Sequence, residues 1–148
     1  MNSILTVINK TSENFPEDTF IKLADSVLQD ELADEAGKVK PVPELCLILC
    51  DGEMIRELNR KYRGKDAKTD VLSFEGDYPA IPELGDIVID IEKALGQKGT
   101  MSLNYEVQTL FLHGLLHLLG YDHISHKQQL EMKNKEKLYQ KYLKEIDR

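Results

Sequence analysis

The sequence has no tryptophan, only two cysteines, and no apolar run of the roughly 20 residues that a membrane-spanning helix needs. Its first fifteen residues lack the basic stretch and long apolar core of a secretory signal peptide. Cys46 and Cys50 fall in a strand-like segment, where residues four apart are separated by about 13 Å, too far for a disulfide. These absences predict a cytoplasmic protein with reduced, buried thiols and no membrane partner.

The composition is that of a globular chain. Of the 148 residues, 41% are hydrophobic and 30% are charged, which excludes a disordered chain. This length is typical of one domain with one core, and no repeat, low-complexity tract or linker divides the sequence. We therefore expect a single domain over residues 1–148.

Charge is distributed unevenly around a net value of −7. Residues 11–37 contain one lysine and eight acidic residues, whereas residues 56–68 contain six basic residues and two acidic ones. Residues 127–148 contain seven basic and four acidic residues. The basic segments allow a phosphate-bearing partner despite the overall sign. The alternative is a set of solvated helix faces, which we favour for residues 127–148.

Hydrophobic periodicity predicts four strands and five helices. The expected strands cover residues 3–10, 44–50, 69–75 and 84–91. The expected helices cover residues 16–32, a segment after Asp51, a short segment ending near residue 96, residues 103–119 and residues 126–146. In the helix after Asp51, which can cap it, Met54, Ile55, Leu58 and Tyr62 are expected to face inward. The last helix is expected to begin with a capping box formed by Ser125 and Gln128. A strand–helix–strand unit favours parallel pairing, and the short connection after residue 75 permits antiparallel pairing. We therefore expect one mixed sheet with helices packed on it.

Residues 113–123, HGLLHLLGYDH, contain the most informative motif. His113 and His117 lie one helical turn apart on the same face, and Gly120 offers a left-handed end to the helix. The chain can then turn and bring His123 back toward the pair. Three neutral imidazoles leave a tetrahedral metal ion one open position, as in catalytic zinc sites.

The helix around this histidine pair is otherwise apolar on all sides, so we expect it to be buried at the centre of the fold. Buried imidazoles need partners, and without a metal the alternative is a pair of core histidines bonded to backbone or carboxylate groups. For Asp122, orientation of a ligand histidine and a plain turn role fit equally well. His126 is expected to be exposed to solvent.

The spacing of the three histidines is that of the metzincin peptidases, which have glutamate after the first histidine. That glutamate is the general base for peptide hydrolysis, and here the position is Gly114. The motif therefore predicts a metal site of protease type without the base that protease chemistry needs.

HGLLHLLGYDH also matches the motif HGxLHLxGYDH of the YbeY family of bacterial endoribonucleases and rRNA maturation factors without departure. The segments LNRKYRGKDAKTDVLSF at 58–74 and LGDIVI at 84–89 resemble two further signatures of that family. Element order and length agree as well, so the chain resembles the family over essentially its whole length.

This resemblance implies an α+β fold with a mixed four-stranded sheet, about five helices and a buried metal-bearing helix. It implies a zinc-dependent hydrolase that cleaves single-stranded RNA, matures the 3′ end of 16S, small-subunit rRNA, and acts in ribosome quality control. It also implies His113, His117 and His123 as metal ligands and Arg63 as the catalytic arginine. The implied partners are rRNA, the ribosome, and ribosomal proteins or a GTPase assembly factor.

The residues alone support Arg63 more weakly. It lies in the basic segment, in a glycine-containing turn, and a guanidinium suits two-point contact with phosphate. A surface arginine without function is the alternative.

Three imidazoles suit zinc, but also nickel, copper or iron. The sequence leaves open whether water or the ribose 2′-hydroxyl attacks the phosphate.

Two other functions stay open at this point. One is a metallopeptidase or amidohydrolase whose base comes from elsewhere in the chain, which the glycine at 114 disfavours. The other is a non-catalytic ribosome-assembly factor whose metal only holds the loop after Gly120.

Overall fold

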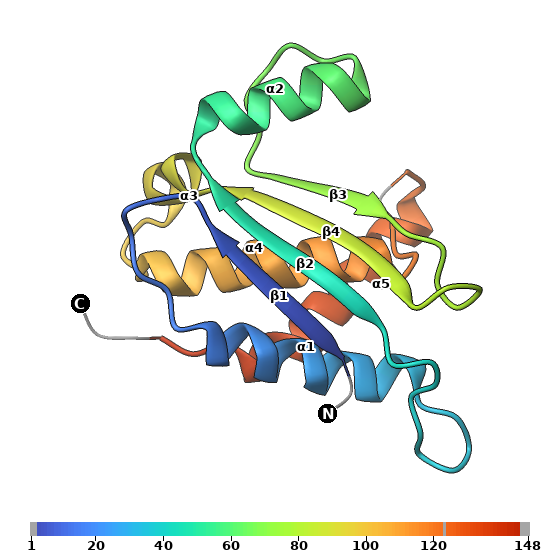
Figure 1. Ribbon diagram of the computed structural model, residues 1–148. Coiled ribbons are helices and arrows are strands. Elements are labelled where there is room, and N and C mark those ends of the chain that lie inside the picture. The colour runs from blue at the N-terminus through green and yellow to red at the C-terminus, as the bar shows by residue number, and fades with distance from the viewer. Residues whose placement is uncertain (1–2, 123, 146–148) are drawn as a thin grey trace.

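A computed structural model describes residues 3–122 and 124–145, which form one four-stranded mixed sheet with five α-helices (Figure 1). The strands are β1 (Ile4–Asn9), β2 (Glu44–Cys50), β3 (Val71–Glu75) and β4 (Glu83–Asp90). The helices are α1 (Glu17–Leu32), α2 (Gly52–Arg63), α3 (Ile91–Gln97), α4 (Leu103–Leu118) and α5 (His126–Tyr139), followed by the short 3₁₀ helix η1 (Gln140–Tyr142). The predicted α+β class, mixed sheet and number of helices are confirmed.

The strand order is β1-β2-β4-β3. β1 pairs with β2 and β2 with β4 in parallel, whereas β3 pairs with β4 in antiparallel orientation. The β1–β2 and β3–β4 pairings follow the expected rule that helix-connected strands run parallel and that a short connection permits antiparallel pairing. The rule fails for β2 and β3, which α2 connects: β2 pairs in parallel with β4 instead, and β3 lies beyond β4 at the edge of the sheet and runs in the opposite direction.

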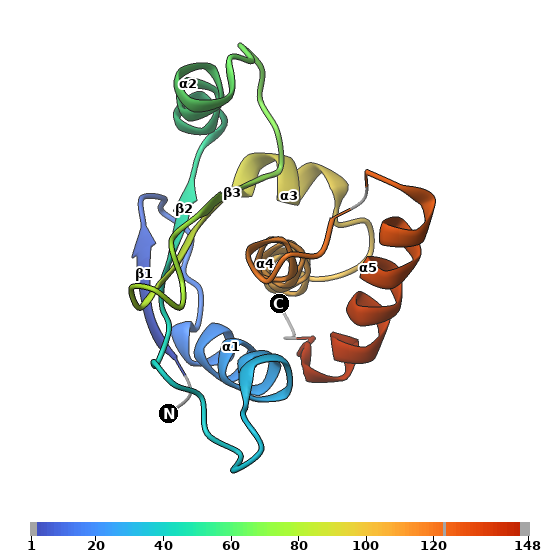
Figure 2. The same ribbon diagram turned by 90° about the vertical axis from the view of Figure 1, so that its right-hand side faces the viewer.

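α4 lies at the centre of the molecule, with the sheet on one side and α5 on the other (Figure 2). Its apolar residues pack into the main core together with side chains from α1 and from the two central strands. Leu47, Leu49, Ile87 and Ile89 on those strands are fully buried. An almost entirely apolar helix is stable in water only in such a position, so the expected central burial is confirmed.

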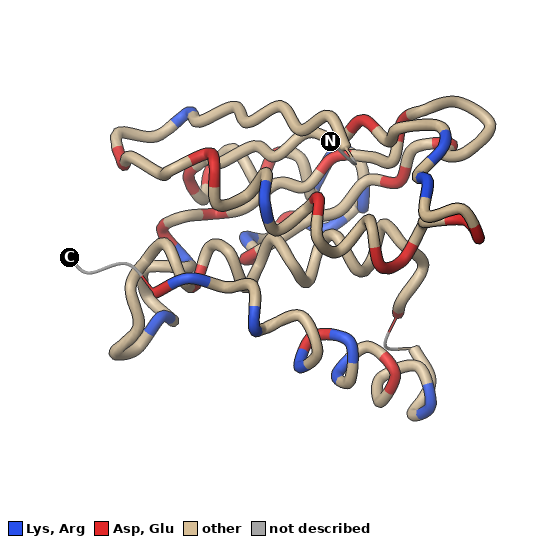
Figure 3. Tube along the Cα trace, turned by 90° about the horizontal axis from the view of Figure 1, so that it is seen from below, with Lys and Arg blue, Asp and Glu red and all other residues tan. Residues whose placement is uncertain are grey.

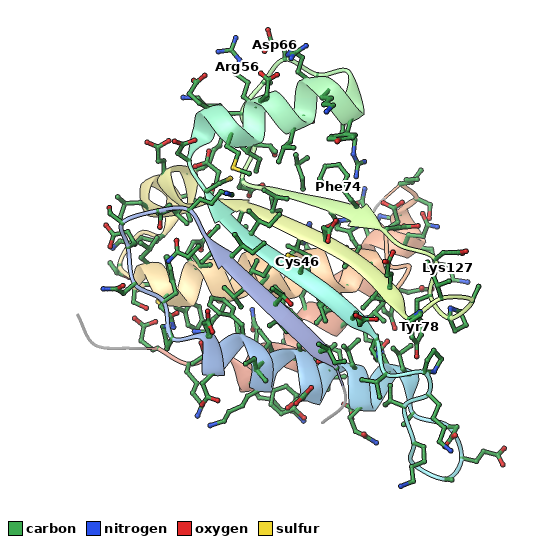
Figure 4. All side chains as sticks on the ribbon, in the orientation of Figure 1. Cys46, Arg56, Asp66, Phe74, Tyr78 and Lys127 are labelled. Atoms are coloured by element: carbon green, nitrogen blue, oxygen red, sulfur yellow. The ribbon has the colours of Figure 1, made fainter. Side chains whose placement is uncertain are left out.

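α2 stands at one end of the sheet and packs against the opposite face through a second, smaller core around Cys50, Ile55, Leu72 and Val88. Phe74 points from β3 toward this helix, and Arg56 lies beside Asp66 on its far side (Figure 4). Of the four residues expected to face inward on α2, Tyr62 does not, because the residue is 59% exposed. The buried residues of α2 end at Asn59, so Tyr62 in the last turn stays largely exposed although its ring contacts Phe74 of β3.

Side-chain caps mark the starts of several helices, two of them as predicted. Asp51 accepts a hydrogen bond from the backbone N–H of Met54. Ser125 and Gln128 form the expected reciprocal capping box at the start of α5.

The last helix is shorter than expected, because α5 ends at Tyr139 rather than near residue 146. Gln108, a buried residue of α4, captures the chain beyond η1: its Nε2 donates to the Lys144 carbonyl at 2.8 Å, and its Oε1 accepts from the Lys144 N–H at 3.1 Å. Helical backbone at residue 144 would use these groups internally, so a tertiary contact ends the helix early.

Lysines and acidic residues alternate along α5, the helix that follows the grey trace of residue 123 in Figure 3. Only Met132 and Tyr139 of this helix are buried, which agrees with the solvated face favoured for the C-terminal basic segment. Within residues 3–122 and 124–145, no helix combines the length and apolar character needed to cross a membrane.

Candidate metal centre

His113 and His117 face each other on the last two turns of α4. Their Nε2 atoms are 3.2 Å apart, and their rings are inclined by 78°. Both side chains are half-buried, whereas most neighbouring residues of the helix are fully buried. The histidine face is thus the part of the central helix that reaches the surface of the core.

The second nitrogen of His113 contacts a carboxylate from another helix. Its Nδ1 lies 3.2 Å from Oε1 of Glu136 on α5. A carboxylate accepts, so Nδ1 carries the proton in a neutral imidazole and Nε2 keeps a lone pair directed toward His117. Ligand histidines in metal sites are oriented by this kind of carboxylate contact. Glu136 lies 23 residues beyond His113, and no sequence pattern pointed to it.

The chain leaves α4 through the turn predicted at Gly120. This residue has a φ of +100°, its N–H donates to the His117 carbonyl, and the N–H of Tyr121 donates to the Leu116 carbonyl, each at 3.0 Å. This pair of bonds is the Schellman ending, which needs a left-handed residue and therefore favours glycine. Asp122 follows it and lines the same cleft as the histidine pair.

The predicted third ligand, His123, lies outside the described residues. In the described remainder of the chain, no group of three or more His, Cys, Asp or Glu side chains is arranged to hold a metal ion. The structure therefore brings together two of the three predicted ligands, and the third stays a prediction.

Gly114 packs directly against the sheet. A Cβ atom at this position would lie 2.8 Å from Cγ2 of Ile87 and 3.1 Å from Oγ of Ser73. The Ser73 hydroxyl also donates to the Gly114 carbonyl at 3.3 Å. The position that carries the base in metzincins is thus a contact between α4 and the sheet, where a glutamate side chain has no room.

A cleft of about 890 Å³ opens beside the histidine pair. It lies between the end of α2, strand β3 and the turn after α4, and its lining residues are Tyr62, Arg63, Lys65, Thr69, Asp70, Val71, Leu72, Ser73, Phe74, Glu75, His113, His117, Gly120, Tyr121 and Asp122. Arg63, predicted from a segment some fifty residues upstream, therefore shares one cleft with both described histidines.

The guanidinium of Arg63 is held at the wall of this cleft. Its Nη2 donates to the Ser73 carbonyl, and its central carbon lies 5.3 Å from the centroid of the Phe74 ring. The Tyr62 ring meets Phe74 edge to face at a centroid distance of 5.6 Å. An arginine and two aromatic rings thus form one packed group in the lining of the cleft.

Most other basic residues of this segment are paired away from the cleft. Arg56 binds Asp66 at 2.7 Å, Arg60 binds Glu57, and Lys68 lies 3.6 Å from Glu53. Lys65 is the other basic residue that lines the cleft among the described residues. Of the six basic residues in segment 56–68, Arg63 and Lys65 therefore line the cleft.

The two cysteines lie on β2 and are free thiols, as predicted, but only Cys50 is buried, whereas Cys46 is half-buried. Burial and the neighbouring carboxylate of Asp90 raise the pKa of Cys50 to about 12. Burial also raises the pKa of Cys46. Both therefore stay protonated at neutral pH, which excludes them as thiolate nucleophiles.

Comparison with known proteins agrees with this arrangement. The family model described as endoribonuclease YbeY matches residues 6–144. A protein named endoribonuclease YbeY from Bacillus licheniformis is 37% identical over 150 residues, which cover 93% of this chain and 92% of that protein. Another of that name from Desulforamulus reducens is 42% identical over 142 residues, covering 88% and 90%. A Thermotoga maritima protein of known solution structure has 26% identity and a TM-score of 0.58, covering 94% of this chain and 88% of that protein.

Proposed function

This chain belongs to the YbeY family of endoribonucleases, and we propose that it cleaves single-stranded RNA with a metal ion, zinc, held by His113, His117 and His123. The observation that carries the proposal is one cleft that is lined by two facing imidazoles and by a guanidinium. The imidazoles supply metal ligands, and the guanidinium supplies a phosphate contact.

The described histidines fit a metal ion. Two nitrogens that bind one zinc ion at about 2.0–2.1 Å in tetrahedral geometry lie about 3.3–3.4 Å apart. The Nε2 atoms of His113 and His117 are separated by 3.2 Å, and Glu136 leaves the lone pair of His113 on the correct nitrogen. A hydrogen bond between two core histidines fits the same distance, so metal analysis is the first test. When bound, a metal ion lowers the pKa of a water molecule toward neutrality and polarises a phosphate oxygen.

Arg63 is placed to contact the phosphate at the cleavage site. A guanidinium has five N–H donors, and among the described residues its hydrogen-bonded partner is the Ser73 carbonyl, at Nη2. Donors on the other two nitrogens remain for a phosphate in the cleft. Because the Ser73 and Phe74 contacts fix the side chain in advance, charge that develops on the phosphate is stabilised without reorganisation.

Tyr62 supports an unpaired strand as the substrate. Its exposed ring rests on Phe74 at the edge of the cleft, beside Arg63 and Lys65. An accessible aromatic ring beside cationic side chains is a surface on which an unstacked base can lie. Bases inside a duplex are already stacked on each other, so this contact favours single strands.

In the cell, we propose that the substrate is precursor small-subunit rRNA at its 3′ end, with a role in ribosome quality control in the cytoplasm. The support is family membership together with the basic, aromatic wall of the cleft. On the same basis, the proposed partners are the ribosome and its proteins or a GTPase assembly factor.

The test combines metal analysis with cleavage of one labelled RNA in single-stranded and duplex form. The native chain is expected to contain zinc and to cleave the single strand preferentially. H117A should lose both metal and cleavage, whereas H126A, which changes an exposed histidine on α5, should lose neither. Undiminished cleavage by metal-free H117A protein would overturn the proposal.

Arg63 needs its own control, because it also packs against β3. R63A should retain zinc and lose about 10²–10³ in kcat, the range for loss of one group that stabilises developing negative charge. R60A, which breaks the Glu57 pair outside the cleft, should cleave as the native protein does. A chain that binds zinc and RNA but never cleaves it would be the non-catalytic assembly factor instead.

A further inference from the structure

Glu31, in the last turn of α1, is a nearly buried carboxylate with three hydrogen-bond donors around it. Its Oε1 accepts from the hydroxyl of Tyr121 at 2.6 Å. Its Oε2 accepts from Nζ of Lys135 at 2.9 Å and from the hydroxyl of Tyr139. The Glu31 side chain is only 10% exposed. One carboxylate thus joins α1, α5 and the turn that follows the histidine helix.

The network is built for the ionised form of Glu31. Burial acts to raise the pKa of this carboxylate, but the hydrogen bonds from Tyr121, Tyr139 and Lys135 outweigh burial and hold the pKa below its ordinary value. Burial and the bond to Glu31 raise the pKa of both tyrosines, so each hydroxyl keeps its proton and remains a donor. All three contacts are therefore present together at neutral pH.

Tyr121 connects this network to the cleft. It follows Gly120 directly, both residues line the cleft, and the backbone N–H of Tyr121 already bonds to the end of α4. The bond to Glu31 fixes the other end of the same residue against α1. The turn is also bonded to the end of α4, because the N–H of Gly120 donates to the carbonyl of His117 at 3.0 Å. A Tyr121 fixed against α1 therefore restrains the helix end that carries His117.

We propose that Glu31 is a positioning residue for the metal site: through Tyr121 it holds the turn at residues 120–122, and with it the end of α4 that carries His117. This inference rests on the metal centre proposed above. Of the three donors to Glu31, Tyr121 alone belongs to the turn, whereas Lys135 and Tyr139 belong to α5. The same carboxylate therefore makes one bond that acts on the turn and two that dock α5.

Two variants that each remove one hydroxyl separate positioning from general stability. Y121F and Y139F each lose one bond to Glu31 and keep the aromatic ring. Both should lower the melting temperature of the metal-free protein. Zinc affinity, measured by competition with a chromophoric chelator, should fall about 10-fold in Y121F, the low end of the range for loss of a group that directly orients a ligand, because Tyr121 acts on His117 only through the turn. In Y139F it should stay within about twofold of the native value. Equal zinc affinity in Y121F and the native chain, or equal losses in both variants, would overturn the proposal.

Hydrogen exchange in the metal-free protein tests the positioning without the metal. Amides of residues 120–122 should exchange faster in Y121F and in E31Q, and at the native rate in Y139F. Unchanged exchange in Y121F refutes the role of Glu31 even if the native chain binds zinc. Conversely, a native chain that binds no zinc but shows the expected exchange pattern refutes the metal centre and leaves the anchoring of the turn established.

Discussion

Replacement of Gly114 by alanine tests the packing that brings the histidine helix onto the sheet. The added methyl group would lie 2.8 Å and 3.3 Å from the two γ-carbons of Ile87 and 3.1 Å from the Ser73 hydroxyl. Ile87 is fully buried, so it cannot move aside into solvent. Overpacking of this kind costs about 1–3 kcal/mol. Alanine regains about 0.5–1 kcal/mol of helix stability over glycine.

The steric cost therefore exceeds the gain in helix propensity, and G114A should be less stable by about 1–2 kcal/mol. At about 2–4 °C per kcal/mol for a chain of this size, the melting temperature should fall by about 2–8 °C. Circular dichroism during heating of the metal-free protein measures it, and urea unfolding checks the free energy.

Gly96 supplies the matched control, since it also lies within a helix, α3. A Cβ atom there meets nothing within 4 Å. G96A should therefore gain only the higher helix propensity of alanine, without a steric cost, and be more stable than the native chain by about 0.5–1 kcal/mol. If G114A melts at or above the native temperature while G96A behaves as expected, the steric argument for glycine at position 114 is wrong.

Two further predictions concern the carboxylates around the site. E136A removes the carboxylate that contacts Nδ1 of His113 and should weaken zinc binding about 10–100-fold. E131A changes an exposed residue of the same helix and should leave zinc binding unchanged. Competition with a chromophoric chelator measures the zinc affinity of both variants. Because the folded-state pKa of Glu31 is below its ordinary value of 4.5, its stabilising contribution is present above about pH 4.5 and lost as the pH falls through the folded-state pKa. Urea unfolding should therefore show E31Q less stable than the native chain at pH 7, with a difference that narrows below pH 4.5; a constant difference would contradict this role.

Local sequence patterns were sufficient to predict much of the fold and, within the site, the histidine pair and the turn that follows it. The i, i+4 histidine pair, the left-handed glycine that ends α4, and the caps at Asp51 and Ser125 all depend on residues within about one turn of each other. The β1–β2 and β3–β4 pairings followed from the kind and length of their connections, whereas the β2–β4 pairing did not. Such features are determined by short-range geometry, which a single sequence displays directly.

Contacts between distant segments were not predictable in this way. Glu136 and Glu31 look like ordinary charged residues of solvated helices, yet one orients His113 and the other accepts from Tyr121, 90 residues away. The early end of α5 has the same origin, because it depends on Gln108 binding Lys144 from another helix. Tyr62 fits a helical apolar stripe, but the small core beneath α2 does not extend far enough to bury it.

Gly114 links the sequence argument to the structural one. In the sequence, glycine at this position meant only that a general base was missing. In the structure, the same glycine lets α4 contact Ile87 and Ser73 closely, and Ser73 also offers its carbonyl to Arg63. One residue of β3 therefore touches both the histidine helix and the arginine. The close approach that excludes a protease-like glutamate is thus the approach that brings imidazole and guanidinium groups into one cleft.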